Sequence, residues 1–406
     1  MKPDAVLKKI EKSRDDIIAE MCDMIKIPAL SPIYGGSGES RRADYLMQRL
    51  SGFDSVKRID LPDEIDPSVI RSNILAKKEG KEAGTVWIVS HMDTVPAGDL
   101  NDWDSPPFQP VVKDGKIYGR GTEDNGQAII SSMFASKFIE KETLTKKSIG
   151  LAMVADEENT SRMGVDYLIK NGCFDKEDVF IVPDWGSPDG KYVEIAEKNL
   201  VWLNFKIIGK STHGSTPNKG VNALRVGSHL IVELEKEFEK LFFIEDPKFI
   251  PEMSTFAPTK SINYVENVNT VPGYYEFSMD IRLIPQYDID EVVKAAKRVA
   301  SRVAEKFWAE ISVEEVQRHL SGKQSSTESE TYLALRDSIK YVTGIDASPV
   351  GVGGATCANF FRKAGYDAYV WETGGGTLHA PNEYVEIENI ITDAKVFATL
   401  FYRLCV

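Results

Sequence analysis

Three short apolar segments in the first half of the chain each end in side chains that can bind a metal ion. Residues 85–90 are followed by His91, residues 148–155 by an acidic triplet, and residues 179–183 by Asp184. Their length and their β-branched and aromatic content are typical of buried strands. Because ligands bind beyond the carboxyl ends of the strands in an open α/β sheet, this pattern predicts an α/β domain with polar groups at one sheet edge.

Each of these positions also has a simpler explanation. His91 and Asp93 are compatible with a strand that merely ends in polar residues. Asp124 begins a predicted helix, where a carboxylate caps free N–H groups. The triplet 156–158 is compatible with a solvated acidic loop, although adjacent carboxylates repel one another in a crevice that holds no cation. The coincidence of four such positions favours a metal site, in which Asp93 would accept the second ring N–H of His91.

The composition argues against several classes of function. The 406-residue chain carries a net charge of -13, which disfavours nucleic acid or an anionic membrane as a partner. We expect neither a secretory leader nor a membrane-spanning segment. The four cysteines are scattered without a CxxC pair, which is typical of free thiols in a reducing compartment. We therefore expect a cytoplasmic protein.

The chain is long enough for two domains, and its pattern changes at about its midpoint. Residues 199–317 follow the order strand–helix–strand–strand–helix–strand, which is typical of a self-sufficient α+β sandwich. A polar stretch at residues 321–326 then leads back to an α/β pattern. The sequence therefore predicts a discontinuous metal-binding domain over residues 1–198 and 318–406, with an inserted domain over residues 199–317.

Three consecutive glycines, Gly374–Gly376, come shortly before His379. Glycine lets a backbone approach another group closely because it has no side chain. We therefore expect this loop to lie close to a bound ligand, with His379 just beyond it.

Five segments resemble, in order, the di-zinc amidohydrolases that include acetylornithine deacetylase, succinyl-diaminopimelate desuccinylase, aminoacylase, carboxypeptidase G and the carnosinase-type dipeptidases. They are SHMDTVP at 90–96, YGRGTED at 118–124, DEE at 156–158, HGSTPNKGVNA at 213–223 and LHAPNE at 378–383. The resemblance covers nearly the whole chain. It implies an α/β, zinc-peptidase-like catalytic domain, a mixed sheet between helices, with an inserted α+β sandwich that serves as lid and dimerisation domain.

The resemblance also implies a ligand set for two zinc ions, which cobalt or manganese could replace. The implied ligands are His91, Asp124, Glu158, Asp184 and His379. Asp124 would bridge the two ions, with His91 and Asp184 completing one site. Glu158 and His379 would complete the other. The peptide bond that follows Asp124 would be cis.

Further roles follow from the same resemblance. Glu157 would be the general base, and Asp93 would orient the imidazole of His91. His213 would stabilise the oxyanion of the reaction, from its own subunit or from a partner subunit.

The implied substrate contacts are Asn269, Arg282 and the pair Gly353–Gly354. Arg282 would suit a substrate carboxylate because a guanidinium can bind a carboxylate through two hydrogen bonds.

The resemblance therefore implies a homodimeric metallohydrolase that cleaves the amide bond of a small dipeptide or N-acyl amino acid. Asp184 favours a dipeptidase, because the deacylases usually have glutamate at this place. A deacylase of the acetylornithine or succinyl-diaminopimelate type stays open. After Asp124 the family usually has lysine and glycine, whereas this chain has Asn125–Gly126–Gln127, so the local contacts must differ. A non-catalytic binding protein with this fold is the remaining alternative, and the presence of Glu157 with every implied ligand argues against it.

Overall fold

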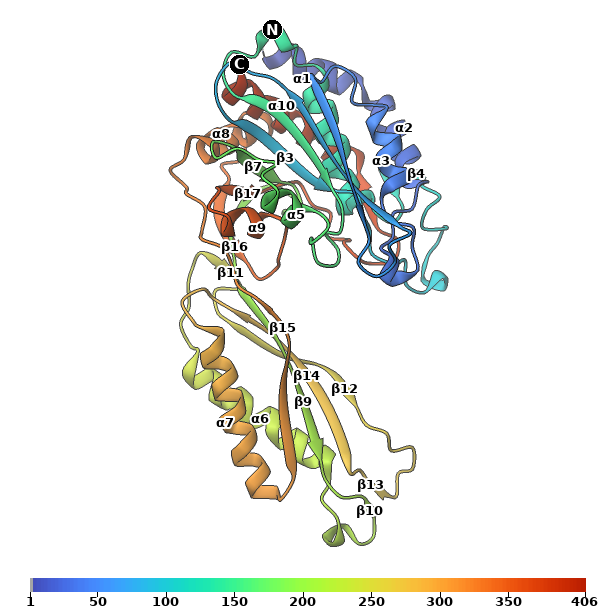
Figure 1. Cartoon of the computed structure of the whole chain (residues 1–406), viewed down its shortest axis with the longest axis vertical. Coiled ribbons are helices and arrows are strands. Elements are labelled where there is room, and N and C mark those ends of the chain that lie inside the picture. Colours follow the sequence, from blue (N-terminus) through green and yellow to red (C-terminus); the bar gives the residue numbers. More distant parts are fainter. Residues whose placement is uncertain (1–2) are drawn as a thin grey trace. The chain divides into compact units, whose positions relative to one another are not determined.

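A computed structural model describes residues 3–406 of the chain (Figure 1). It contains two compact units. The first unit comprises the chain up to Ile195 together with Gly322–Val350 and Thr356–Val406. The second unit comprises Ala196–Ser321 and Gly351–Ala355. Among residues 3–406, every helix is too short or too polar to span a bilayer.

The first unit is built on a mixed sheet whose central strands are parallel. In spatial order the strands are β1 (Ser55–Pro62), β2 (Ile70–Lys78), β6 (Ser148–Val154), β3 (Thr85–His91), β7 (Val179–Val182), β17 (Ala368–Val370), β8 (Tyr192–Glu197) and β16 (Ser348–Val352). β3 pairs in parallel with both β6 and β7, and β7 pairs in parallel with β17. Four neighbouring strands therefore deliver their carboxyl ends to one edge of the sheet.

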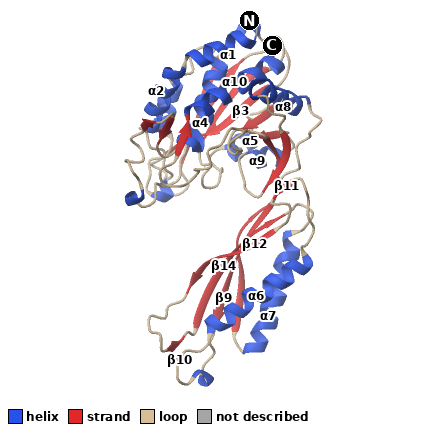
Figure 2. Ribbon diagram, turned by 180° about the vertical axis from the view of Figure 1, so that it is seen from behind, coloured by secondary structure: helices blue, strands red, loops and turns tan. Residues whose placement is uncertain are grey.

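Helices cover both faces of this sheet (Figure 2). They are α1 (Pro3–Lys12), α2 (Arg14–Ile25), α3 (Ser40–Met47), α4 (Gln127–Lys137), α5 (Val165–Lys170), α8 (Glu330–Thr343), α9 (Ala358–Lys363) and α10 (Ile387–Cys405). On one face α4 and α10 pack against each other and against β3 and β6. On the other face α5 and α9 close a cluster in which Phe180 stacks on Phe361, with ring centroids 3.8 Å apart. Such an aromatic pair contributes about 0.5–1.5 kcal/mol beyond the area it buries.

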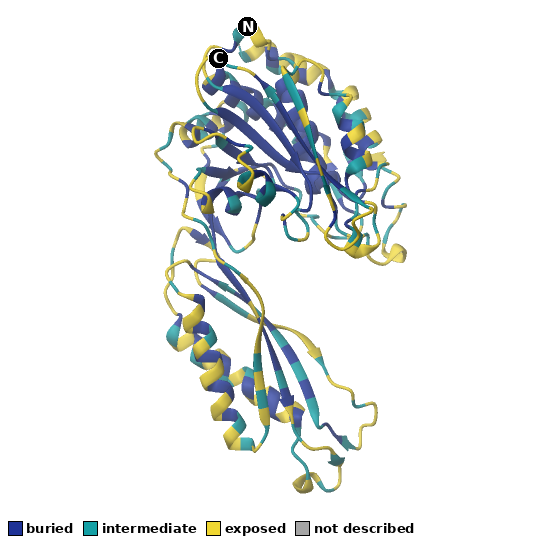
Figure 3. Cartoon of the chain, viewed as in Figure 1, coloured by how far each residue is buried: buried dark blue, intermediate teal, exposed yellow. Residues whose placement is uncertain are grey.

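The central strands are buried from end to end (Figure 3), and this explains their nearly continuous apolar sequence. A separate small sheet has the order β18 (Tyr384–Glu386), β5 (Lys116–Tyr118) and β4 (Val111–Lys113). β5 and β18 are antiparallel, and Tyr118 lies opposite Tyr384. This pairing joins the segment that precedes Asp124 to the segment that follows His379.

The second unit is a four-stranded antiparallel sheet with the order β12 (Thr255–Ile262), β14 (Tyr274–Leu283), β9 (Asn199–Ile208) and β15 (Glu310–His319). Its core also contains residues of α6 (Ala223–Leu241) and α7 (Ile289–Phe307). Along β14, half-buried and buried residues alternate, as expected for a strand with one face on a core. Two short strands, β10 (Thr212–His213) and β13 (Thr270–Val271), form a ribbon near the start of β14. β11 (Phe249–Ile250) pairs with Gly351 and Val352.

Candidate metal centre

The carboxyl ends of β3, β6 and β7 bring four of the predicted side chains together. β3 ends at His91, Glu157 and Glu158 follow β6, and Asp184 follows β7. In register, His91 lies opposite Val154, the last residue of β6. Asp124 joins them from the loop that precedes α4. Two groups of side chains there could hold a metal ion, with their ligand atoms within 4.8 Å of one another: His91, Asp124 and Glu158, and His91, Glu157 and Asp184.

Asp124 lies between two histidines. The Nε2 atom of His91 is 2.8 Å from Oδ1 of Asp124, and it is 3.2 Å from Oδ1 of Asp184. The Nε2 atom of His379 is 3.0 Å from Oδ2 of Asp124, and it is 3.1 Å from Oε2 of Glu158. The two carboxylate oxygens of Asp124 thus face different histidines, an arrangement that lets one carboxylate bind two ions.

The electrostatics of the cluster fit a bound cation. Burial raises the pKa of Glu157 well above its ordinary value, and the charge of Asp184 adds to this effect. Burial and the charge of Asp124 likewise raise the pKa of Glu158 to about 7. The Oε1 atom of Glu158 is buried without a hydrogen-bond partner. Cations would relieve this repulsion, and a set of imidazole nitrogens and carboxylate oxygens suits zinc.

Asp93 contacts the cluster in two ways. Its carboxylate accepts the backbone N–H groups of Glu157 and Glu158, each at 3.1 Å, and so holds the turn that carries both glutamates. The Nδ1 atom of His91 lies 3.0 Å from the backbone carbonyl oxygen of Asp93 and 3.6 Å from its Oδ1 atom. The nearest partner of the second ring nitrogen is therefore the carbonyl of Asp93, whereas the sequence pointed to its carboxylate.

Asn125, at the point where the chain departs from the family pattern, joins two of the strand ends. Its amide Nδ2 donates to the carbonyl of Pro183 and, at 3.2 Å, to Oδ1 of Asp184. Its Oδ1 atom accepts the backbone N–H of His91 at 3.2 Å. The Asp124–Asn125 peptide bond is cis, as the resemblance implied. Sequence reasoning left these contacts undetermined.

Arg71 is a second residue that sequence reasoning missed. It is buried on β2 and donates to the carboxylates of Glu39 and Asp63. It also reaches Oδ1 of Asp156 at 3.3 Å and lies 4.0 Å from Oδ2 of Asp93. One guanidinium therefore balances several carboxylates directly behind the turn that carries the two glutamates. The only signal in the sequence is an arginine next to an apolar strand.

In the second unit, the predicted residues occupy two separate places. His213 lies opposite Thr270 in the β10–β13 ribbon, and the backbone N–H of Gly214 donates to the carbonyl of Asn269 at 2.6 Å. His213 and Asn269 are thus neighbours at the end of the unit where β14 begins.

Arg282 lies near the other end of β14, where it donates to the carbonyl of Gly353 at 2.7 Å. Its guanidinium is also bound by the carboxylate of Asp280, at 2.7 and 3.0 Å. A side chain added at Gly353 or Gly354 would meet open space, so these glycines offer an uncovered backbone.

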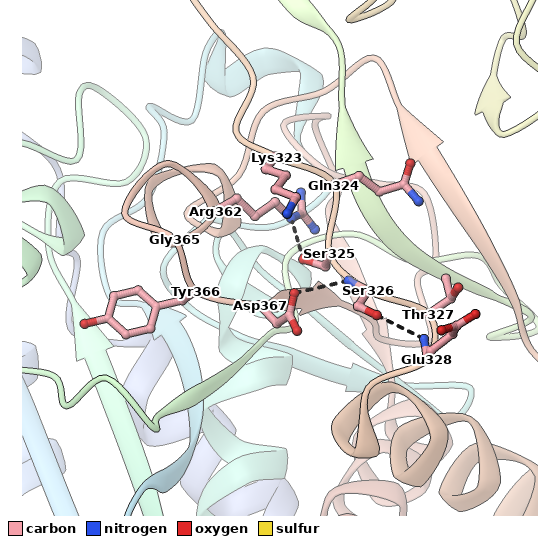
Figure 4. A pocket seen from close by; sticks show the side chains of 10 residues that line it. All are labelled: Lys323, Gln324, Ser325, Ser326, Thr327, Glu328, Arg362, Gly365, Tyr366 and Asp367. Atoms are coloured by element: carbon pink, nitrogen blue, oxygen red, sulfur yellow. Dashed lines mark hydrogen bonds between the residues drawn. The ribbon is translucent and has the colours of Figure 1, made fainter.

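A pocket of the first unit, with a volume of about 500 Å³, includes none of the predicted site residues (Figure 4). It is lined by Lys323, Gln324, Ser325, Ser326, Thr327, Glu328, Arg362, Gly365, Tyr366 and Asp367. Its wall is held by a hydrogen bond from the N–H of Ser326 to Asp367 at 3.1 Å. Arg362, one of its lining residues, is a buried ion-pair partner of Glu194.

Comparison with known proteins agrees with this geometry. Residues 87–403 match the sequence profile of peptidase family M20/M25/M40. An uncharacterised metallohydrolase of Methanococcus maripaludis is 37% identical, and the match covers 94% of this chain and 98% of the relative. The succinyl-diaminopimelate desuccinylase of Pelagibacter ubique is 25% identical, with coverage of 93% of this chain and 96% of the relative.

Solved structures extend the comparison to the fold. A dipeptidase of Saccharomyces cerevisiae superposes with a TM-score of 0.75 at 19% identity, and the match covers 99% of this chain and 98% of the yeast chain. The predicted fold class is therefore confirmed.

Proposed function

This chain belongs to peptidase family M20/M25/M40 and is a metallohydrolase, and we propose that it cleaves the amide bond of a small dipeptide or N-acyl amino acid with two bound zinc ions. The observation that carries the proposal is the position of Asp124, whose two oxygens face His91 and His379. His91, Asp124 and Asp184 would hold one ion. Asp124, Glu158 and His379 would hold the other.

The chemistry that two such ions supply is a polarised substrate carbonyl and a water molecule of lowered pKa. Glu157 would accept the proton of this water as it attacks the carbonyl, and would then donate it to the leaving amine. Of the two adjacent glutamates, Glu158 is the better candidate metal ligand and Glu157 the better candidate base. The reason is that Oε2 of Glu158 lies 3.1 Å from Nε2 of His379. Burial and the charge of Asp184 raise the pKa of Glu157, which makes its carboxylate a stronger proton acceptor than that of an exposed glutamate.

A dipeptide is the favoured substrate. Asp184 occupies the place at which the dipeptidases of the family carry aspartate. Arg282 would bind the carboxylate of the substrate, and would do so in competition with Asp280, which already holds part of its guanidinium. A deacylase is the second candidate, and the sequence similarity to a desuccinylase over most of both chains supports it.

A substrate panel tests the proposal. We expect purified protein supplied with zinc, cobalt or manganese to cleave dipeptides faster than N-acetylornithine or N-succinyl-diaminopimelate. Release of the free amine is the measurement, and protein treated with a chelator is the control. Cleavage of the acylated substrates alone would establish the deacylase. Cleavage of no member would contradict the proposed substrate class.

We also propose that the protein is a homodimer in which His213 serves the metal centre of the partner subunit. The support comes from the second unit alone, where the β10–β13 ribbon that carries His213 precedes the start of β14 and Arg282 lies near the other end of this strand. Two groups so far apart are better suited to serve different metal centres, and a dimer supplies the second one.

A mixing experiment checks the dimer. The variants His213→Ala and Asp124→Ala should each be inactive alone. When they are mixed and allowed to exchange subunits, about a quarter of the wild-type activity should return, because half of the dimers then contain one complete centre. Activity can return only if His213 of one subunit serves the metal centre of the other subunit. If no activity returns although exchange is complete, the residue acts in its own subunit.

A further inference from the structure

Two loops of the first unit leave the small three-stranded sheet side by side. One runs from the end of β5 to Asp124, and the other carries His379 and ends where β18 begins. The antiparallel pairing of β5 with β18 brings the two loops together although more than half of the chain separates them in sequence. Each loop thus carries a candidate metal ligand, and the distance between these ligands depends on how the loops are joined.

Glu383, on the second loop, holds the backbone of the first. Its Oε1 atom accepts the N–H groups of Glu123 and Asp124, each at 3.0 Å. Its Oε2 atom accepts the N–H of Gly121 at 3.0 Å and pairs with Arg120 at 2.7 Å. The carboxylate is fully buried, so these donors replace all of its solvation.

Glu123, on the first loop, holds the backbone of the second in the same manner. Its Oε1 atom accepts the N–H groups of Gly375 at 2.5 Å and Gly376 at 2.7 Å. Its Oε2 atom accepts the N–H of Thr377 at 2.7 Å and the hydroxyl of the same residue. Glu123 is 1% exposed, so this carboxylate also depends on the opposite loop for its hydrogen bonds.

The glycine run explains how the second loop can surround a carboxylate. Successive backbone N–H groups form a concave anion-binding surface when no side chain is in the way. A Cβ atom added at Gly375 would touch Oε1 of Glu123 at 3.4 Å, and Gly376 has a φ of +78°, which side chains rarely adopt. In the structure, the backbone N–H groups of this loop therefore bind the carboxylate of Glu123, whereas the sequence indicated a bound molecule or ion at this place.

We propose that Glu123 and Glu383 form a reciprocal clasp that sets the separation of Asp124 and His379, and that Glu123 is a positioning residue of the metal centre. The inference rests on the proposed two-ion function. The clasp acts on the site of Asp124, Glu158 and His379, since His379 is the ligand on the clasped glycine loop. Partners that orient metal ligands in this way typically change metal affinity by about 10- to 100-fold when they are removed.

Cobalt titration of the variant Glu123→Gln tests the clasp. Glutamine keeps the shape of the side chain but places an NH2 group opposite donors, so one half of the clasp must open. We expect the first cobalt ion to bind within a few-fold of the wild-type affinity, and the second to bind about 10- to 100-fold more weakly. The visible absorption contributed by the second equivalent of cobalt should therefore appear only at higher cobalt concentrations in the variant. Asp178→Asn is the matched control, because Asp178 is a buried carboxylate that binds backbone N–H groups at the opposite edge of the sheet.

A milder pair of variants keeps the test informative if Glu123→Gln does not fold. Thr377→Val removes the hydroxyl that donates to Glu123 and accepts the N–H of Tyr384 at 3.2 Å. It should weaken the second ion by several-fold, whereas Thr377→Ser keeps the hydroxyl and should bind that ion with the wild-type affinity. Hydrogen exchange provides a readout without metal: the amides of Gly375–Thr377 should be protected in the wild type and exchange faster in Glu123→Gln.

The outcomes separate the clasp from the proposed function. Wild-type protein that binds two ions, together with variants that bind both ions equally well, would overturn the clasp and leave the function in place. Rapid exchange of the Gly375–Thr377 amides in the wild type would also overturn the clasp. Wild-type protein that binds no second ion would overturn the proposed function, and with it the role of the clasp.

Discussion

Replacing Glu157 with alanine is expected to lower kcat by about 10²- to 10⁴-fold while two metal ions remain bound. The reason is that Glu157 is proposed to move the proton and not to hold an ion. It lies in the turn that follows β6, and its backbone N–H is bound by the carboxylate of Asp93, so loss of its side chain leaves the turn in place. Burial and the charge of Asp184 raise the pKa of Glu157, so its carboxylate accepts a proton more readily than that of an exposed glutamate.

The measurement combines steady-state kinetics with the metal content of the same preparation. Glu157→Gln is the closest comparison, because the amide keeps the size of the side chain but cannot accept the proton. Glu158→Ala is the contrasting variant, since it should lose an ion as well as activity. Unchanged turnover in Glu157→Ala would reject the assigned mechanism, and loss of an ion in that variant would make Glu157 a ligand.

The grouping of the strand-end residues could be predicted because it depends on a local pattern. A buried parallel strand is recognisable by its apolar run, and neighbouring parallel strands end at one edge. This pattern grouped His91, the pair Glu157–Glu158 and Asp184 without any knowledge of distances, and only the resemblance to the family chose Glu158 as the ligand. The same reasoning cannot say which atoms meet, and the contact of His91 with the carbonyl of Asp93 is an example.

The residues that escaped prediction act through contacts that are distant in sequence. Glu123 meets the glycine loop across more than 250 positions. Arg71 meets Asp156 across 85 positions. A periodic pattern carries no information about such pairs, because it reflects only the face of an element that is buried. Edge strand β1 was missed for a related reason: its residues are half-buried or exposed, and so it has no apolar run.

The second unit shows a further limit of motif-based prediction. His213 and Arg282 entered the same set of site residues because both match family positions. The structure places them near opposite ends of β14. A motif gives the order of residues along the chain, and the length of a strand then decides whether they can serve one centre. At about 3.3 Å per residue, the length of β14 is what separates them.

Asp124→Ala is expected to abolish turnover, with a loss of more than about 10⁴-fold, and to leave fewer than one metal ion per chain. The variant removes a ligand from both ions at once, because Oδ1 of Asp124 faces His91 and Oδ2 faces His379.

Asp184→Ala is the matched control for this substitution. Asp184 lies next to His91 and is proposed to bind only the ion that His91 binds. Its loss should therefore release that ion and keep the other. Metal content after extensive dialysis and the two-step cobalt titration distinguish the variants. Asp124→Ala protein that keeps both ions would show that Asp124 does not bridge them. Asp124→Ala protein that loses only one ion, as Asp184→Ala is expected to do, would show two independent sites in place of a shared one. Only a shared carboxylate couples the loss of both ions to a single substitution.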